Sequence, residues 1–396
     1  MRWIKGILKG LGVLLAALVL VVIGLYLTDP PYWKRLATAP IGEVWRTGWY
    51  SPQERVPGVV RDDIVLGPPE DIDPSALAAA QQYADETQSV ALLVWHKGAL
   101  RYERYGKGFD RDTRTETSSA HKTVVGLLTG AAIADGYIKS IEQPAADFLP
   151  EWDDEARKKI TIGHLLTMSS GLEVISGMNP AARGMKLMLG GEINRIVMPL
   201  RAVQPAGEVF EYANTNPQFL GTVISRATGK RYAEYLSERL WSRLGAGDAA
   251  VWLDSEGGTP RTFCCLFTTA RGWLRVGLLL LNQGRVGNAQ VIPAEWVAAQ
   301  LSPSAANPNY GYLTWLGSPP GTERTYNSKN PLKAFHSEPF VAPDVAFIDG
   351  FGGQRVYVVP SEQLIIVRTG KAQLKWDDAR LPNTILRGLR KGGQVP

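Results

Sequence analysis

Residues 118–137 read SSAHKTVVGLLTGAAIADGY, an apolar run that is typical of a buried helix and that ends at Asp135-Gly136. Ser119 and Lys122 stand three positions apart at the start of this run. Residues at i and i+3 share one helix face, with Cβ atoms roughly 5–6 Å apart, so this hydroxyl and this amine can meet. A neutral lysine could then take the serine proton and activate a nucleophile.

This chemistry requires Lys122 to lose its charge. A free lysine side chain has a pKa near 10.4, so being largely neutral at pH 7 requires a fall of about 3 in that pKa, or roughly 4 kcal/mol. Burial in an apolar environment can lower a lysine pKa by this amount. The apolar side chains within residues 124–128 favour such burial.

Two neighbouring side chains offer alternatives to this pair. His121 lies two positions from Ser119, about 200° around the helix, so we expect it to pack or to face solvent rather than to act as the base. Ser118 lies four positions before Lys122 and could also reach it, so it stays an alternative nucleophile. An isolated S-x-x-K also arises by chance as a capping serine and a solvated lysine, so its context decides its meaning.

Two further stretches supply that context. Residues 161–172 read TIGHLLTMSSGL, and residues 204–214 read QPAGEVFEYAN. In this order, the three stretches resemble the motifs of the serine β-lactamase-like superfamily, which includes class C β-lactamases, DD-peptidases and related esterases. The resemblance covers about residues 75–390 and is greatest to the 6-aminohexanoate-dimer (nylon oligomer) hydrolase branch. Weaker matches are Thr269-Ala270-Arg271 and Tyr310-Gly311-Tyr312.

The resemblance implies roles for four side chains. Ser119 would be the nucleophile, and Lys122 and Tyr212 would transfer its proton. A phenol with a pKa near 10 is a useful base only if an ammonium group beside it stabilises the phenolate. Asn214 would orient the substrate or the lysine by hydrogen bonds.

A glycine-rich stretch, residues 350–354, occupies the place of the family's K-T-G or H-x-G motif. Glycines such as Gly350 and Gly352 allow the backbone to approach a substrate closely. We expect the backbone N–H groups of Phe351 and Ser119 to form the oxyanion hole, where one donor is worth roughly 3–4 kcal/mol. The alternatives are a glycine-rich hairpin turn and a register shifted by one residue.

The missing lysine or histidine of this motif bears on the substrate. It removes a partner for the carboxylate of β-lactams and peptide stems, and so favours other esters or amides. We therefore expect a serine hydrolase that cleaves a small-molecule ester or amide through an acyl-enzyme on Ser119. A β-lactamase or DD-peptidase-type activity and a catalytically silent penicillin-recognising module stay as alternatives. The four histidines are widely spaced and form no HExxH motif, so we expect no metal, and no organic cofactor is implied.

The order of the predicted elements indicates the fold class. A hairpin is predicted over Val90–Tyr105, and three strands near the C-terminus over Val345–Ile348, Arg355–Val359 and Leu364–Arg368. The helices predicted besides residues 118–137 are Pro74–Glu86, Ile162–Met168, Pro217–Thr228, Tyr232–Leu244, Thr268–Asn282 and Asp377–Lys391. This order predicts an α/β protein of the α+β type, with one antiparallel sheet built from N- and C-terminal strands around an inserted helical region. The resemblance makes this a β-lactamase/transpeptidase-like fold, in which we expect residues 173–202 to form a wall of the pocket.

The N-terminus predicts a membrane anchor. Gly10–Leu27 is an uncharged, mostly apolar run of 18 residues, which as a helix is roughly 27 Å long and close to the bilayer thickness. Basic residues before it favour a cytoplasmic N-terminus and an extracytoplasmic (in a Gram-negative bacterium, periplasmic) catalytic domain. A cleavable signal peptide is the alternative, but the run leads into Leu27-Thr28-Asp29-Pro30-Pro31 rather than into small residues.

We divide the chain accordingly into an N-terminal transmembrane anchor (residues 1–28), an irregular, proline-rich arm (29–70) and a serine hydrolase domain (71–396). Aromatic residues near the anchor could form an interfacial belt or could pack onto the main domain. They are Tyr26, Tyr32, Trp33, Trp45 and Trp49.

Composition narrows the remaining function classes. The 396 residues carry a net charge of +5 from 43 basic and 38 acidic side chains without a long basic run, so we expect no nucleic-acid partner. The only cysteines, Cys264 and Cys265, are adjacent, and we expect two core residues rather than a disulfide. The oligomeric state is not predicted by the sequence.

Overall fold

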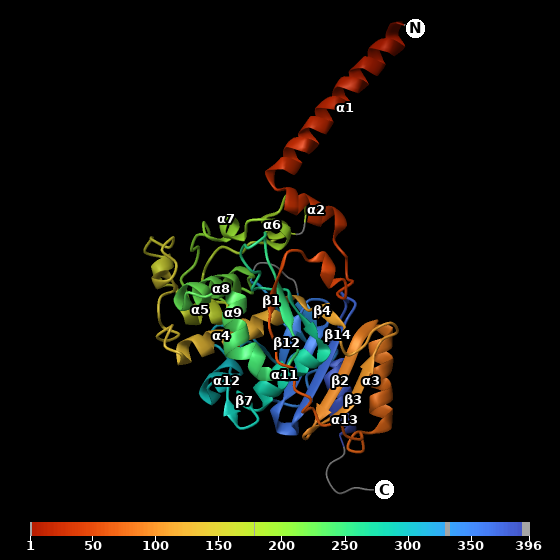
Figure 1. The fold of residues 1–396 in the computed structure, drawn as a ribbon, viewed down its shortest axis with the longest axis vertical. Helices are drawn as coiled ribbons and strands as arrows, with labels where there is room; N and C mark the ends of the chain where they lie inside the picture. Colours follow the sequence, from red (N-terminus) through yellow and green to blue (C-terminus); the bar gives the residue numbers. More distant parts are fainter. Residues whose placement is uncertain (1, 178, 329–332, 390–396) are drawn as a thin grey trace.

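The computed structural model describes residues 2–177, 179–328 and 333–389. Within them, the main sheet is antiparallel and has six strands in the order β3-β2-β14-β13-β12-β9. Its bounds are β2 (Ser89–His96), β3 (Ala99–Tyr105), β9 (Trp315–Leu316), β12 (Ala346–Gly350), β13 (Gln354–Val359) and β14 (Leu364–Gly370). Strand β14 pairs with β2, so the N-terminal hairpin and the C-terminal strands lie side by side (Figure 1). The predicted fold class and hairpin are confirmed.

Helices cover both faces of this sheet. On one face lies α11 (Ala270–Leu281), whose Gly277 approaches Val356 and Ile365 so closely that a Cβ there would lie 2.9 Å from the Ile365 side chain. On the other face, α3 (Pro74–Glu86) packs against α13 (Arg380–Gly388) and β2. Successive strand residues point to opposite faces, and accordingly Tyr357, next to Val356, contacts Trp376 on the α3 side.

The inserted helical region contains the predicted helices with shifted ends. They are α4 (His121–Ala134), α5 (Ile162–Leu166), α8 (Thr215–Thr228), α9 (Tyr232–Leu236) and α10 (Ser242–Leu244). Three further helices, α6 (Arg183–Leu189), α7 (Ile193–Val197) and α12 (Ala294–Gln300), were not predicted. Helix α4 begins three residues later than predicted, because Ser118–Ala120 forms a 3₁₀ turn (η2) in which Ser118 has a φ of +48°. A π-helical turn, η5 (Ser237–Trp241), joins α9 to α10.

A second sheet was not predicted. Within the described residues it has four strands in the order β1-β5-β6-β4. These are β1 (Gln53–Val56), β5 (Ala249–Trp252), β6 (Leu266–Thr269) and β4 (Arg114–Glu116), each too short to show a strand pattern. Its strand β6 includes Thr268, for which the sequence predicts a helix. Its strand β4 ends at Glu116, so that one residue separates it from the turn that begins the S-x-x-K motif.

The N-terminal segment departs from the expectation of an irregular arm. Helix α1 (Arg2–Thr28) projects away from the body (Figure 1), and its part Gly6–Thr28, with a mean hydropathy of 2.7, is long and apolar enough to cross a membrane. Residues 29–70 then contain helix α2 (Pro30–Thr38) and strand β1. Two of the prolines that suggested irregularity, Pro30 and Pro31, instead start α2, because proline suits the first helical positions and the Asp29 side chain caps the helix.

The remaining elements are short. They are η1 (Thr47–Trp49), η3 (Ala145–Asp147), η4 (Arg157–Lys159), η6 (Pro360–Glu362), β7 (Arg285–Val286), β8 (Ala289–Gln290), β10 (Glu323–Thr325) and β11 (Lys333–Phe335). The predicted C-terminal helix begins at Arg380 rather than Asp377, and its predicted end at Lys391 lies outside the described residues.

Candidate active site

The turn before α4 places Ser119 and Lys122 together. The Glu116 carboxylate accepts hydrogen bonds from the backbone N–H of Ser118 (2.5 Å) and from its hydroxyl (3.0 Å), and so holds the turn in place. Nζ of Lys122 lies 2.7 Å from Oγ of Ser119. Since the Ser118 hydroxyl is engaged by Glu116, the geometry favours Ser119 as the partner of the lysine.

Lys122 lies in an apolar environment and is only 1% exposed. Its Nζ donates a hydrogen bond of 2.7 Å to the backbone carbonyl of Phe263. Burial lowers the pKa of Lys122 to about 7, against the opposing effect of the carboxylates of Asp349 and Glu116. A large fraction of this amine is therefore neutral at neutral pH.

His121 faces away from this pair and is fully buried. Its Nδ1 lies 2.7 Å from the carbonyl oxygen of Cys264, and its Nε2 lies 2.9 Å from the Tyr232 hydroxyl. Burial lowers the pKa of His121 to about 4, so the ring stays neutral. The predicted packing role of His121 is confirmed.

The two cysteines correct a prediction, because Cys264 and Cys265 are joined by a disulfide bond. Neighbouring cysteines seldom satisfy disulfide geometry, but here Cys265 adopts a left-handed conformation with a φ of +68°. The backbone N–H of Cys265 donates to the carbonyl of Ser118 at 3.2 Å. Together with the carbonyls of Phe263 and Cys264, this segment lines the buried side of the Ser119 turn.

Backbone hydrogen bonds between the stretches 161–172 and 204–214 position Tyr212 at the site. The N–H groups of Gly207 and Glu211 each donate 2.8 Å hydrogen bonds, to the carbonyls of Ser169 and Met168 respectively. This pairing holds residues 168–169 beside residues 207–211. It brings the ring of Tyr212 to 4.9 Å from Nζ of Lys122.

The surroundings of Tyr212 favour the neutral phenol. Burial raises its pKa, the Asp349 carboxylate adds to the rise, and a hydrogen bond with the Ser119 side chain opposes it. The ring is enclosed by Tyr310, Trp315 and Tyr326. Tyr212 thus holds its proton where Lys122 readily loses one, which differs from the phenolate base that the sequence argument considered.

Asn214 lies immediately before α8, beside the expected wall of the pocket. Its Nδ2 lies 3.9 Å from Sδ of Met188 in α6, within the segment 173–202. The structure therefore brings Asn214 to the wall, where its amide can orient a substrate.

The glycine-rich stretch packs against the Ser119 turn. A Cβ on Gly350 would lie 2.1 Å from the carbonyl oxygen of Thr117, so only glycine permits this approach. Gly352 and Gly353 have positive φ values of +74° and +85° and form the turn from β12 to β13. The stretch is thus both a hairpin turn and a neighbour of Ser119. The side chain of Phe351 at its tip is 59% exposed.

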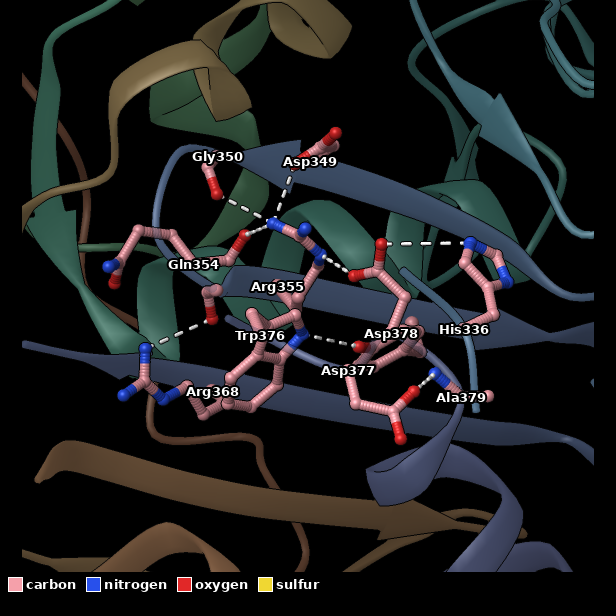
Figure 2. A network of polar contacts seen from close by, with 12 residues as sticks. His336, Asp349, Gly350, Gln354, Arg355, Arg368, Trp376, Asp377, Asp378 and Ala379 are labelled. Carbon is pink, nitrogen blue, oxygen red and sulfur yellow. Dashed lines mark hydrogen bonds and ion pairs between the residues drawn. The ribbon is translucent and has the colours of Figure 1, made fainter. Parts of the chain in front are cut away.

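A buried charge network behind this hairpin was missed by the sequence argument (Figure 2). Arg355 bonds to Asp349 and Asp378, and Arg324 contacts the same two carboxylates. Although burial opposes its ionisation, these guanidinium groups hold the pKa of Asp378 at about 2. Asp349 also accepts a 2.9 Å hydrogen bond from Tyr326, whose carbonyl accepts the N–H of Tyr212.

Two charged residues in otherwise apolar strands, Asp349 in β12 and Arg355 in β13, were the sequence feature that could have indicated this network. Across the described residues, no group of three or more His, Cys, Asp or Glu side chains is placed to hold a metal ion.

Comparison with known proteins identifies the family of the chain. The family described as Beta-lactamase matches residues 76–385. The chain belongs to the beta-lactamase family. It is 28% identical over 288 residues to the 6-aminohexanoate-dimer hydrolase of Paenarthrobacter ureafaciens, across 68% of this chain and 70% of that protein.

The fold of this beta-lactamase family member is similar to that of several solved structures. One is the beta-lactamase from Sulfitobacter sp. EE-36, with a TM-score of 0.60 and 17% identity; the match covers 81% of this chain and 98% of the other. Another is EstCE1, a hydrolase with promiscuous acyltransferase activity, at a TM-score of 0.60 and 15% identity over 79% and 97%. The predicted superfamily and the prediction of a hydrolase are confirmed.

Proposed function

We propose that this beta-lactamase family member is a membrane-anchored serine hydrolase that cleaves an ester or amide through an acyl-enzyme on Ser119. The observation that carries the proposal is the 2.7 Å separation of Ser119 Oγ from Nζ of Lys122, an amine whose pKa burial lowers to about 7. A neutral amine in hydrogen-bond contact with a hydroxyl is the arrangement needed to activate a serine.

In the first half of the reaction, Lys122 takes the hydroxyl proton as Oγ attacks the carbonyl carbon. The N–H groups of Phe351 and Ser119 stabilise the tetrahedral oxyanion, and Asn214 orients the substrate. The phenol of Tyr212 gives its proton to the leaving oxygen or nitrogen and is reprotonated by the Lys122 ammonium. That ammonium is stabilised meanwhile by the face of the Tyr212 ring, 4.9 Å from Nζ.

In the second half, water attacks the acyl carbon of the ester on Ser119. Lys122 accepts a proton from the water, and Oγ recovers a proton as the acid leaves. The net reaction adds one water across the ester or amide bond, and every proton that moves is returned. The residues that the sequence singled out therefore supply each transfer without an outside group.

Substrate class follows from the third motif. Gly350, Phe351 and Gly352 offer no side-chain cation to a substrate carboxylate, and Arg324 and Arg355 are occupied by Asp349 and Asp378. These features support uncharged esters and amides over β-lactams and peptide stems.

Helix α1 supports membrane anchoring, since its apolar side chains are exposed along its length. With basic residues before the span, we place the catalytic domain on the extracytoplasmic side.

The test is labelling of the full chain with a fluorophosphonate probe, followed by mass-spectrometric mapping. We expect modification of Ser119, loss of labelling in Ser119→Ala and retention in the matched control Ser118→Ala. Hydrolysis of short esters should exceed that of a chromogenic cephalosporin. Label on another residue would refute the mechanism. Rapid cephalosporin cleavage with esters untouched would instead support the β-lactamase alternative, and binding without any turnover would support a silent recognition module.

A further inference from the structure

A cavity of about 190 Å³ lies directly beside the Ser119 turn. Ser118, Cys265 and Phe351 line it on the side of the site, and Met188 and Leu189 of α6 line it on the side of the wall. The cavity therefore reaches Ser118, the chain neighbour of Ser119, and Phe351 of the glycine-rich stretch.

Residues 39–44 and 49–50, which connect the membrane-proximal helix α2 to the domain, build most of the remaining cavity lining, and Glu116, Trp252 and Ala372 complete it. Ile41 stands at the tip of a turn and is 91% exposed. The turn is fixed because the carbonyl of Gly42 accepts a 3.1 Å hydrogen bond from the N–H of Ala372. Ile41 and the half-exposed Phe351 thus present two large apolar side chains to solvent at one cavity.

Helix α2 is built into the wall of this cavity rather than loosely tethered. The buried guanidinium of Arg35 donates to the carbonyls of Leu189 and Gly190, both at 3.0 Å, and to that of Asp254 at 2.8 Å. Tyr32, also buried, donates to the carbonyl of Pro180 at 2.5 Å. Helices α2 and α6 consequently pack together at the end of the molecule from which α1 projects (Figure 1).

The lining selects an uncharged, apolar group. Its aromatic and aliphatic members include Val44, Trp49, Tyr50 and Trp252. The carboxylates of Glu116 and Glu43 also border the cavity. Ser118 engages both oxygens of Glu116, and Arg46 forms an ion pair with Glu43 at 3.2 Å. Since a cavity of about 150 Å³ accommodates a six-carbon ring, a volume of 190 Å³ accommodates about six to eight carbons.

The cavity also lies close to the membrane that α1 would enter. The nine residues of α2 span only about 14 Å, and the first cavity-lining residue, Ala39, follows this helix directly. An apolar chain leaving the bilayer therefore has a short path to the cavity.

We propose that this cavity binds the apolar chain, about six to eight carbons deep, of an amphiphilic ester or amide that resides in the membrane. The inference rests on the proposed function, since it names the substrate class of the same hydrolytic site. The arm that joins anchor to domain then sets chain-length specificity, and the anchor holds the site beside its substrate pool.

The first test uses the full chain in detergent and esters with chains of two to twelve carbons, varied in the acyl part and, separately, in the alcohol part. We expect kcat/KM to rise about threefold to fourfold per buried methylene up to about eight carbons in one of the two series. Ala39→Trp, which fills the cavity, should lower the ratio of kcat/KM for the eight-carbon ester to kcat/KM for the two-carbon ester at least tenfold. Ile41→Ser should lower the same ratio about threefold, and the matched control Val59→Ser, also exposed but away from the cavity, should not.

The outcomes separate this inference from the proposed function. A ratio of eight-carbon to two-carbon rates that neither Ala39→Trp nor Ile41→Ser changes would overturn the cavity assignment, although hydrolysis at Ser119 would stand. Two-carbon ester hydrolysis that survives Ser119→Ala would overturn the proposed function itself.

The membrane source of the substrate is tested with phosphatidylcholine vesicles. We expect a vesicle-embedded ester to be hydrolysed at least tenfold faster when the reconstituted full chain shares its vesicle than when enzyme and ester are in separate vesicles. Equal rates in the two arrangements would overturn the membrane source.

Discussion

The guanidinium of Arg355 donates a 2.6 Å hydrogen bond to the carbonyl of Gly350, the last residue of β12 (Figure 2). The same side chain is bonded to the carboxylates of Asp349 and Asp378, and all three charged groups are buried. A buried ion network thus fixes the strand end that packs against the Ser119 turn. The backbone next to Phe351 is therefore held in part by charges behind the β12–β13 hairpin.

Replacing Arg355 by methionine should therefore destabilise the protein and slow the reaction. Removing one partner of a buried ion pair leaves an uncompensated charge and costs about 3–5 kcal/mol. Displacing the strand end by a fraction of an ångström to 1 Å should lower kcat by up to about 10²-fold. Urea unfolding and steady-state kinetics measure the two effects.

The control for this variant is Arg387→Met, which breaks a largely exposed pair with Glu338. We expect it to change the unfolding free energy by less than about 1 kcal/mol and to leave kcat unaltered. Equal effects of the two substitutions would show that the network behind β12 has no special role.

The pH dependence of kcat/KM should show an ascending limb with an apparent pKa of about 7, because Lys122 acts as a base only after losing its proton. Glu116 also titrates near this pH, since burial raises its pKa to about 7. Because the Glu116 carboxylate raises the pKa of Lys122, Glu116→Gln should move the limb to lower pH and preserve it. A limb that vanishes in Glu116→Gln would assign the titration to the carboxylate instead.

Much of the fold and part of the candidate site could be predicted from local sequence patterns. The approach of Ser119 to Lys122 depends on i, i+3 spacing alone, and the hairpin β2–β3 depends on a local turn. Both are properties of a few consecutive residues, so the pattern that encodes them can be read directly.

The features that the sequence did not reveal depend on contacts between distant segments. The disulfide of Cys264 and Cys265 occurs where Cys265 has a left-handed backbone and donates its N–H to the carbonyl of Ser118, far away in the sequence. Arg355 meets Asp378 across 23 positions, and no local pattern signals that pairing. The wall contact of Arg35 with Leu189, 154 positions apart, is likewise a product of the tertiary fold.

Lys122→Met should abolish activity and yet stabilise the folded protein. The pKa of Lys122 is lower in the folded state than in the unfolded state, so between about pH 7 and 10 the unfolded chain binds more protons and the lysine disfavours folding. Removing it should raise the unfolding free energy at pH 7 by up to about 4 kcal/mol, and the gain should shrink as pH approaches 10. Urea unfolding at several pH values tests this, and a destabilised variant at pH 7 would contradict a discharged amine.

Tyr212→Phe should discriminate between leaving groups. An alkoxide or amide nitrogen needs a proton as it departs, whereas p-nitrophenolate leaves without one. Loss of the phenol should therefore lower kcat for alkyl esters and amides by about 10²–10⁴-fold, and kcat for p-nitrophenyl esters much less. Tyr310→Phe is the matched control, because Tyr310 is buried against the Tyr212 ring and this substitution removes a hydroxyl from the same aromatic cluster. Steady-state rates on paired alkyl and p-nitrophenyl esters give the comparison. Equal losses on both ester types in Tyr212→Phe would show that the phenol supports the structure of the site and does not protonate the leaving group.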